Sequence, residues 1–103
     1  MTETRMIDPL GRELILDDRT WYGHILKSHP EIAELRNLVE LAIKALDEIH
    51  ISRLDANCRL YYGQGPRSSV MMVAVADLSL GIIKTAHLAR KPLAGLFEWS
   101  KST

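Results

Sequence analysis

Residues 58–88, CRLYYGQGPRSSVMMVAVADLSLGIIKTAHL, contain three β-prone runs separated by short turn sequences. Cys58–Tyr62 is rich in aromatic residues, and Ser69–Asp77 has the continuous apolar middle of a central strand. Leu80–Leu88 follows after a tight connection at residues 77–79. Because short connections join antiparallel neighbours, this stretch predicts an antiparallel meander.

The residues before this stretch add a fourth strand and a helix. Glu48–Leu54 has strand character, and Asp55-Ala56-Asn57 is a turn sequence that leads into the next strand. Residues 30–46 predict an amphipathic helix with Pro30 at its first position and an end near Leu46. Its apolar face consists of Ile32, Leu35, Leu38, Val39, Ala42, Ile43 and Leu46.

The N-terminal part predicts a hairpin and a first helix. Residues 5–16 form two short runs around a Pro-x-Gly turn at residues 8–11. Asp17 or Asp18 is a suitable N-cap for a helix in which Trp21, His24, Ile25 and Ser28 recur at helical spacing. Pro30 should end this helix and hold His29 in an extended conformation.

Together these signals predict an α+β fold, with a short N-terminal hairpin and two helices packed on a four-stranded antiparallel sheet. The 103 residues predict one domain, with a core of about residues 11–88 and a C-terminal tail of residues 89–103. We expect the tail to dock on the core or on a partner through its apolar residues. These are Pro92, Leu93, Leu96, Phe97 and Trp99.

Composition narrows the class of protein. Lys+Arg and Asp+Glu both number 13, so no overall field attracts nucleic acid, although one or two phosphates can still be held locally. The only cysteine, Cys58, excludes an intrachain disulfide and favours a reducing, cytoplasmic location. No apolar run reaches the roughly 18 residues of a membrane span, and the first residues lack the apolar core of a signal peptide.

The segment from His24 to Glu31, HILKSHPE, has the highest density of side chains that could take part in catalysis. Histidine exchanges protons near neutral pH, and RNA cleavage by the 2′-hydroxyl needs a base and an acid. On one unbroken helix the two histidines would point away from each other. The break predicted at His29 lets them converge, so we expect them to act as an acid/base pair.

Structural explanations stand beside this hypothesis. His24 shares a helix face with Trp21 and Ile25, so it also fits a half-buried core position. His29 fits a role as the cap of the second helix, and Glu31 fits the positive end of that helix dipole.

The remaining sequence patterns do not indicate a metal, cofactor or dinucleotide site. The four histidines are dispersed and no paired-cysteine pattern occurs, so we expect no metal and no cofactor. Gly63-Gln64-Gly65 lacks a third glycine and a following helix, so it predicts a loop rather than a dinucleotide site. Polar residues on the predicted strands either hold a phosphate or form a solvated sheet face. They are Arg53, Arg59, Tyr61, Lys84, Thr85 and His87.

Several of these elements occur together in one known group of domains. The combination of Trp21, His24, Ile25 and the His29-Pro30-Glu31 element with Leu60-Tyr61-Tyr62 and the Ile82–Ala86 strand resembles the phage-associated barnase/EndoU/colicin/RelE-like (BECR) nuclease domains. The resemblance extends from about Gly11 to Leu88. It implies a barnase/RelE-like fold and metal-independent endoribonuclease activity.

The resemblance also implies roles for particular residues and partners. His24 and His29 would be the acid and base, Thr85 a site hydroxyl, and Arg53, Arg59 or Lys84 phosphate ligands; Tyr61 joins them as a substrate-binding candidate. RNA is the implied substrate, and a toxin of this kind is blocked by an antitoxin or immunity protein. The neutral charge and the single-domain chain depart from many such nucleases.

Two alternative functions remain open on the sequence. One is an inactive BECR-like domain, which would serve as a protein-binding module or a phage-related structural protein. Its tail would then mediate contact with a partner or a homo-oligomer. The other is an enzyme that acts on a different phosphoester or nucleotide.

Overall fold

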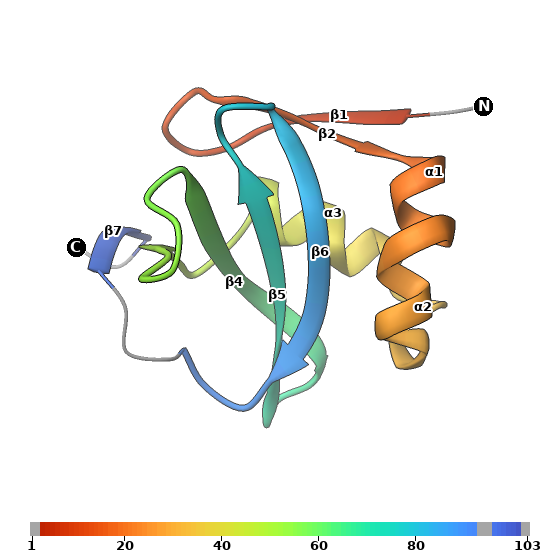
Figure 1. Cartoon of the computed structure of the whole chain (residues 1–103). Coiled ribbons are helices and arrows are strands. Elements are labelled where there is room, and N and C mark those ends of the chain that lie inside the picture. Colours follow the sequence, from red (N-terminus) through yellow and green to blue (C-terminus); the bar gives the residue numbers. More distant parts are fainter. Residues whose placement is uncertain (1–2, 93–95, 102–103) are drawn as a thin grey trace.

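Seven strands form one curved, mixed sheet, a half-barrel, in the computed structural model, which describes residues 3–92 and 96–101 (Figure 1). The strands are β1 (Glu3–Ile7), β2 (Glu13–Asp17), β3 (Glu48–Ile51), β4 (Cys58–Arg67), β5 (Val70–Asp77), β6 (Ile82–Ala89) and β7 (Leu96–Ser100). Their order across the sheet is β1-β2-β6-β5-β4-β3-β7.

The strands predicted from β-propensity are present at the centre of this sheet. β3, β4, β5 and β6 pair in that order, and each pair is antiparallel. β4 continues through the predicted loop at residues 63–66 and reaches Arg67, with a bulge between Gln64 and Arg67. The loop prediction for this segment was therefore wrong, because Gly63 and Gln64 pair with Met72 and Met71 of β5 and continue the strand.

The predicted four-stranded sheet under two helices is wrong. The hairpin β1–β2 joins the sheet through a short parallel contact in which the Ile15 amide donates to the Gly81 carbonyl at 2.9 Å. β7 covers the other side by pairing with β3. Both additions occupy strand edges that would otherwise present unpaired backbone groups. Local periodicity carries no signal for such long-range pairing, so the number of strands predicted for the sheet was too small.

The first helical segment begins where the sequence predicts. Asp17 accepts a hydrogen bond from the Thr20 amide at 2.7 Å and so caps α1 (Asp18–Thr20). A π-helical turn, η1 (Trp21–Ile25), and α2 (Leu26–Ser28) continue the segment. His29 leaves the helix with φ −136° and ψ 67°, as the following proline requires.

The predicted long helix over residues 30–46 is divided. A 3-10 turn, η2 (Pro30–Ile32), is separated from α3 (Arg36–Lys44) by Leu35, whose φ of −116° is not helical. The apolar face predicted for the helix is nevertheless buried at Ile32, Val39 and Ile43. Within residues 3–92 and 96–101, no helix has both the length and the apolar character needed to cross a bilayer.

Close packing of α3 against β4 organises the core. A Cβ atom at Gly63 would lie 2.8 Å from the Ala42 Cα, so only glycine lets this helix approach the sheet. Trp21 and Ile25 pack into the same buried cluster, with 1% and 0% of their surfaces exposed. The sheet face that meets α3 is therefore the main apolar interface.

The expected tail is part of the sheet. Trp99 of β7 pairs with Ile49 and packs against the core, while Leu96 and Phe97 remain 55% and 61% exposed. Leu93, which the sequence also assigned to the apolar tail, lies outside the described residues.

Candidate functional site

Most of the side chains that could take part in proton transfer lie on the sheet face opposite α3. Side chains alternate between the two faces of a strand, and Gly63 faces α3. Tyr62 therefore faces the other way, which we call the far face. One row of residues paired across four strands defines this face: Glu48, Tyr62, Val73 and His87.

Two histidines meet beside β6. His29 lies just beyond α2, where Pro30 turns the chain, and its ring centroid is 5.6 Å from that of His87. His29 Nδ1 also lies 3.4 Å from a carboxylate oxygen of Glu31, which helps to orient its ring. Thr85 precedes His87 by two residues on β6 and so belongs to the same far face. This arrangement, the histidine pair, combines two proton carriers, a carboxylate and a nearby hydroxyl.

The two histidines have different surroundings. Burial lowers the pKa of His87 below its usual 6.5, and the neighbouring His29 lowers it further, while Glu31 acts weakly in the opposite direction. The lowered pKa of His87 favours its neutral form, which is the form that accepts a proton. His29 is partly open to solvent, with 34% of its side chain exposed.

We expect His87 to titrate below pH 6.5 in an NMR titration of its ring protons. His29→Ala removes the positive neighbour and should raise the pKa of His87, although burial keeps it below 6.5. His24→Ala should leave this titration unchanged. A midpoint at or above 6.5 in the unmodified protein, or no response to His29→Ala, would contradict the geometry.

A second polar cluster lies on β3 and β4 of the same face. His50 Nε2 lies 2.7 Å from Glu48 Oε1, and its ring meets the edges of Tyr62 and Phe97 at 5.1 and 5.9 Å. Among the described residues, His50 Nδ1 is buried without a hydrogen-bond partner. Phe97 covers this ring, so the cluster is closed in this conformation.

The structure brings together only some of the residues predicted from the sequence. His29 and Thr85 lie near His87, but His24 is exposed on η1 and no described side chain joins it to His29. The predicted convergence of His24 and His29 is therefore not seen. His24 shares its helical segment with the buried Trp21 and Ile25 but projects outward, so it is not a core histidine either.

Arg59 and Tyr61 belong to a different, mostly buried network of hydrogen bonds and ion pairs. Tyr61 is 0% exposed and donates a hydrogen bond of 2.6 Å to Asp8, while Arg59 Nε lies 2.8 Å from Glu98. Arg12 connects the two carboxylates through contacts of 2.7 Å to each. Burial, followed by the Asp8 carboxylate, raises the pKa of Tyr61 and keeps its phenol protonated. This network joins the N-terminal turn to β4 and β7.

The remaining predicted ligands lie elsewhere. Arg53 is exposed in the loop after β3. Lys84 occupies the β6 bulge, with its Nζ 3.6 Å from Cys58 Sγ. The described contact of Lys84 is therefore with Cys58 and not with the histidine pair.

One group of potential metal ligands occurs among the described residues, Asp55, Cys58 and Asp77. Burial raises the pKa of the Cys58 thiol, and the Lys84 ammonium already lies beside it. Both features oppose cation binding at this group, because a metal ligand must be a thiolate and a nearby positive charge repels the ion.

Sequence patterns did not single out His87 as a proton carrier and did not predict the contact between Glu48 and His50. His87 appeared there only as one of several polar strand residues, because strand register was unknown. Two signals were present: alternation with Thr85 on one strand, and Glu48 and His50 two residues apart on another.

Comparison with known proteins identifies no matching family model. It likewise finds no significant match among curated proteins or solved structures.

Proposed function

We propose that this protein is a metal-independent endoribonuclease that cleaves RNA at the histidine pair. The observation that carries the proposal is the 5.6 Å separation of the His29 and His87 rings, with the pKa of His87 lowered by burial. Two adjacent imidazoles in unlike environments are suited to separate base and acid roles. The resemblance of the sequence elements to BECR nucleases favours the same chemistry.

The reaction follows from these roles. Neutral His87 removes the proton from an RNA 2′-hydroxyl, whose oxygen attacks the adjacent phosphorus. His29 in its protonated form donates to the departing 5′-oxygen as the phosphorus–oxygen bond breaks. The products are a 2′,3′-cyclic phosphate and a free 5′-hydroxyl. Thr85, two residues from His87 on β6, donates a hydrogen bond to a phosphate oxygen in this mechanism.

The test uses the full chain and a mixed-sequence, single-stranded RNA in excess EDTA. We expect cleavage that persists in EDTA and leaves 2′,3′-cyclic phosphate ends, detected by mass spectrometry. An otherwise identical 2′-deoxy strand should remain intact, because it lacks the nucleophile. Loss of activity in EDTA, or cleavage of the deoxy strand, would contradict the mechanism.

The biological setting forms part of this proposal. A cytoplasmic toxin that is held inactive by an antitoxin or immunity protein fits the single cysteine and the resemblance. Such a partner would have to cover the far face or the entrance to the histidine pair.

A protein-binding module is the second candidate, and one observation favours it. β7 lies at one edge of the sheet, where its backbone can pair with a strand of a partner or of a second copy. Its exposed side chains Leu96 and Phe97 would add an apolar contact surface. Size-exclusion chromatography with light scattering separates the candidates. A dimer that Phe97→Asp converts to a monomer supports this function, whereas a monomer in both cases counts against self-association.

A further inference from the structure

Three exposed cations gather at the end of the sheet nearest the histidine pair. Arg67 closes β4 opposite Val70, and Ala89 pairs with Met71, so Arg90 and Lys91 leave β6 at the same end. Only two residues separate His87 from Arg90. We call Arg67, Arg90 and Lys91 the basic end.

These cations have no carboxylate partner among the described residues, unlike many others in the chain. Arg67, Arg90 and Lys91 are all exposed. Five cations elsewhere lie within 4.0 Å of carboxylates, namely Arg5, Arg12, Arg36, Arg59 and Lys101. Four exposed cations, Arg19, Lys27, Lys44 and Lys84, also have no carboxylate within that distance among the described residues, but they do not share one end of the sheet with His87. The basic end is therefore a local positive surface on a chain whose formal net charge is zero.

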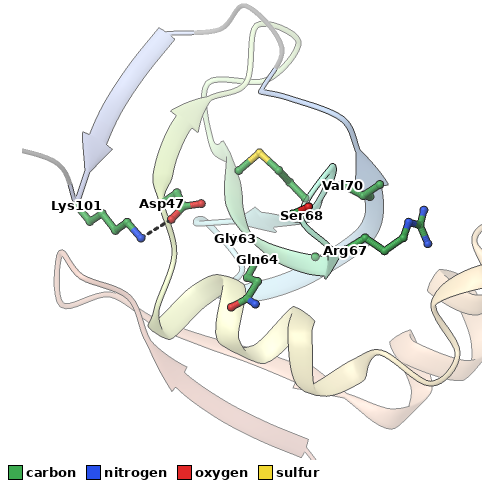
Figure 2. A pocket seen from close by; sticks show the side chains of 9 residues that line it. Asp47, Gly63, Gln64, Arg67, Ser68, Val70 and Lys101 are labelled. Carbon is green, nitrogen blue, oxygen red and sulfur yellow. Dashed lines mark ion pairs between the residues drawn. The ribbon is translucent and has the colours of Figure 1, made fainter.

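The backbone of the β4–β5 turn positions one of these cations. The bulge between Gln64 and Arg67 interrupts the regular alternation of side chains, and bulges often re-aim a residue beside a functional site. In Figure 2 the Arg67 side chain extends away from the Asp47–Lys101 ion pair on the other side of the turn. Its guanidinium is thus not directed at the nearest acidic group of the pocket.

A hollow beside the turn adds polar groups to this surface. Its volume is about 270 Å³, and its lining includes Gln64, Ser68 and the Asp47–Lys101 pair (Figure 2). Amide and hydroxyl groups next to unpaired cations are suited to phosphates and nucleotide edges.

The geometry points to the basic end as a binding site for the phosphates of single-stranded RNA that flank the cleaved bond. This inference rests on the proposed function and extends it, because the cations lie at the same end of the sheet as His87. Arg67, Arg90 and Lys91 contact the RNA backbone, and none of them takes part in proton transfer. The phosphate ligands predicted from sequence, Arg53, Arg59 and Lys84, are replaced by these three.

The test measures binding without cleavage. A fluorescent 12-nucleotide RNA with 2′-O-methyl groups throughout lacks the nucleophile, and its anisotropy reports affinity at several salt concentrations. We expect the variant Arg67→Ala/Arg90→Ala/Lys91→Ala to bind about tenfold more weakly at low salt, with the slope of log affinity against log salt reduced by about two.

A matched variant removes the same charge elsewhere. Arg19→Ala/Lys44→Ala/Arg53→Ala also loses three exposed cations, and we expect its affinity and salt slope to stay close to those of the unmodified protein. Equal losses in both variants would show a general charge effect and overturn the site. An unmodified protein that does not bind the RNA would overturn it as well.

The two proposals can fail separately. If the basic end binds RNA but the protein cleaves none, the nuclease function fails and the binding site stands. If the protein cleaves RNA while loss of the basic end changes neither affinity nor salt slope, the binding site fails and the nuclease function stands.

Discussion

Replacing His87 by alanine is expected to lower the rate of RNA cleavage by about 10²- to 10⁴-fold, the usual contribution of one general acid or base. The lowered pKa of His87 gives it the neutral imidazole that the 2′-hydroxyl needs, and no other described histidine lies beside His29. His29→Ala should cause a loss of similar size. The double variant should lose little more, because the two groups act in one step.

His24→Ala is the matched control for these variants. His24 is an exposed histidine on the same helical segment as His29, yet it does not contact the histidine pair. We expect its activity and its thermal unfolding to match those of the unmodified protein. If His24→Ala abolished cleavage while His87→Ala retained it, the pairing predicted from sequence would be right and the geometric assignment wrong.

Replacing Asp8 by alanine is expected to destabilise the fold by about 3–5 kcal/mol, the cost of removing one partner from a buried ion pair. The Asp8 side chain is 0% exposed and accepts hydrogen bonds from Tyr61, from Arg12 and from the backbone amides of Leu10 and Arg12. Its loss leaves the Tyr61 phenol and part of Arg12 unsatisfied. A domain of this size has a total stability of only about 5–10 kcal/mol, so urea unfolding should show a large shift.

Tyr61→Phe provides a milder version of the same test. It removes one hydrogen bond to Asp8 and keeps the ring in the core, so we expect a loss of about 1 kcal/mol. Thr4→Ala should have less effect, because its 3.4 Å contact with Glu40 is long and only partly buried. Equal stability of Tyr61→Phe and the unmodified protein would show that the network contributes little.

The network also predicts how stability changes in acid. Burial alone raises the pKa of Asp8, but hydrogen bonds from Tyr61 and Arg12 outweigh it and hold that pKa below the usual 3.8. Hydrogen bonds from Arg12 and Arg59 likewise outweigh burial and hold the pKa of Glu98 below 4.5. These carboxylates stabilise the fold above about pH 4.5, and the contribution is lost as pH falls through the lowered values. In Asp8→Ala this acid dependence should be weaker.

Local sequence accounts for much of the scaffold. The runs at residues 58–62, 69–77 and 80–88 became β4, β5 and β6, and Asp17 became the cap of the first helix. The break at His29 follows from its neighbour Pro30, whose ring excludes the α conformation at the preceding residue. Each of these features depends on interactions over a few residues, which the order of amino acids specifies directly.

The helix predicted over residues 30–46 shows where local signals end. Its apolar spacing persists through the interruption at Leu35, because a 3-10 turn and a short helix can bury the same residues. Periodicity identified the side chains that face the core, of which Leu35 and Leu38 are only partly buried, but it did not identify the backbone that carries them. Packing against the sheet determines which backbone is adopted.

The site depends on register and long-range pairing. His87 faces His29 because β6 lies beside the first helical segment, and Tyr61 turns inward to Asp8 whereas Tyr62 turns to the far face. One step of register would exchange the two faces, so residue type alone does not assign them. The chain order therefore specified strands, turns, the helix cap and the break at His29. Packing across the sheet joined the predicted hairpin, β1 and β2, to β6, added β7, and made His87, rather than His24, the neighbour of His29. These contacts join segments far apart in sequence, so local patterns do not specify them.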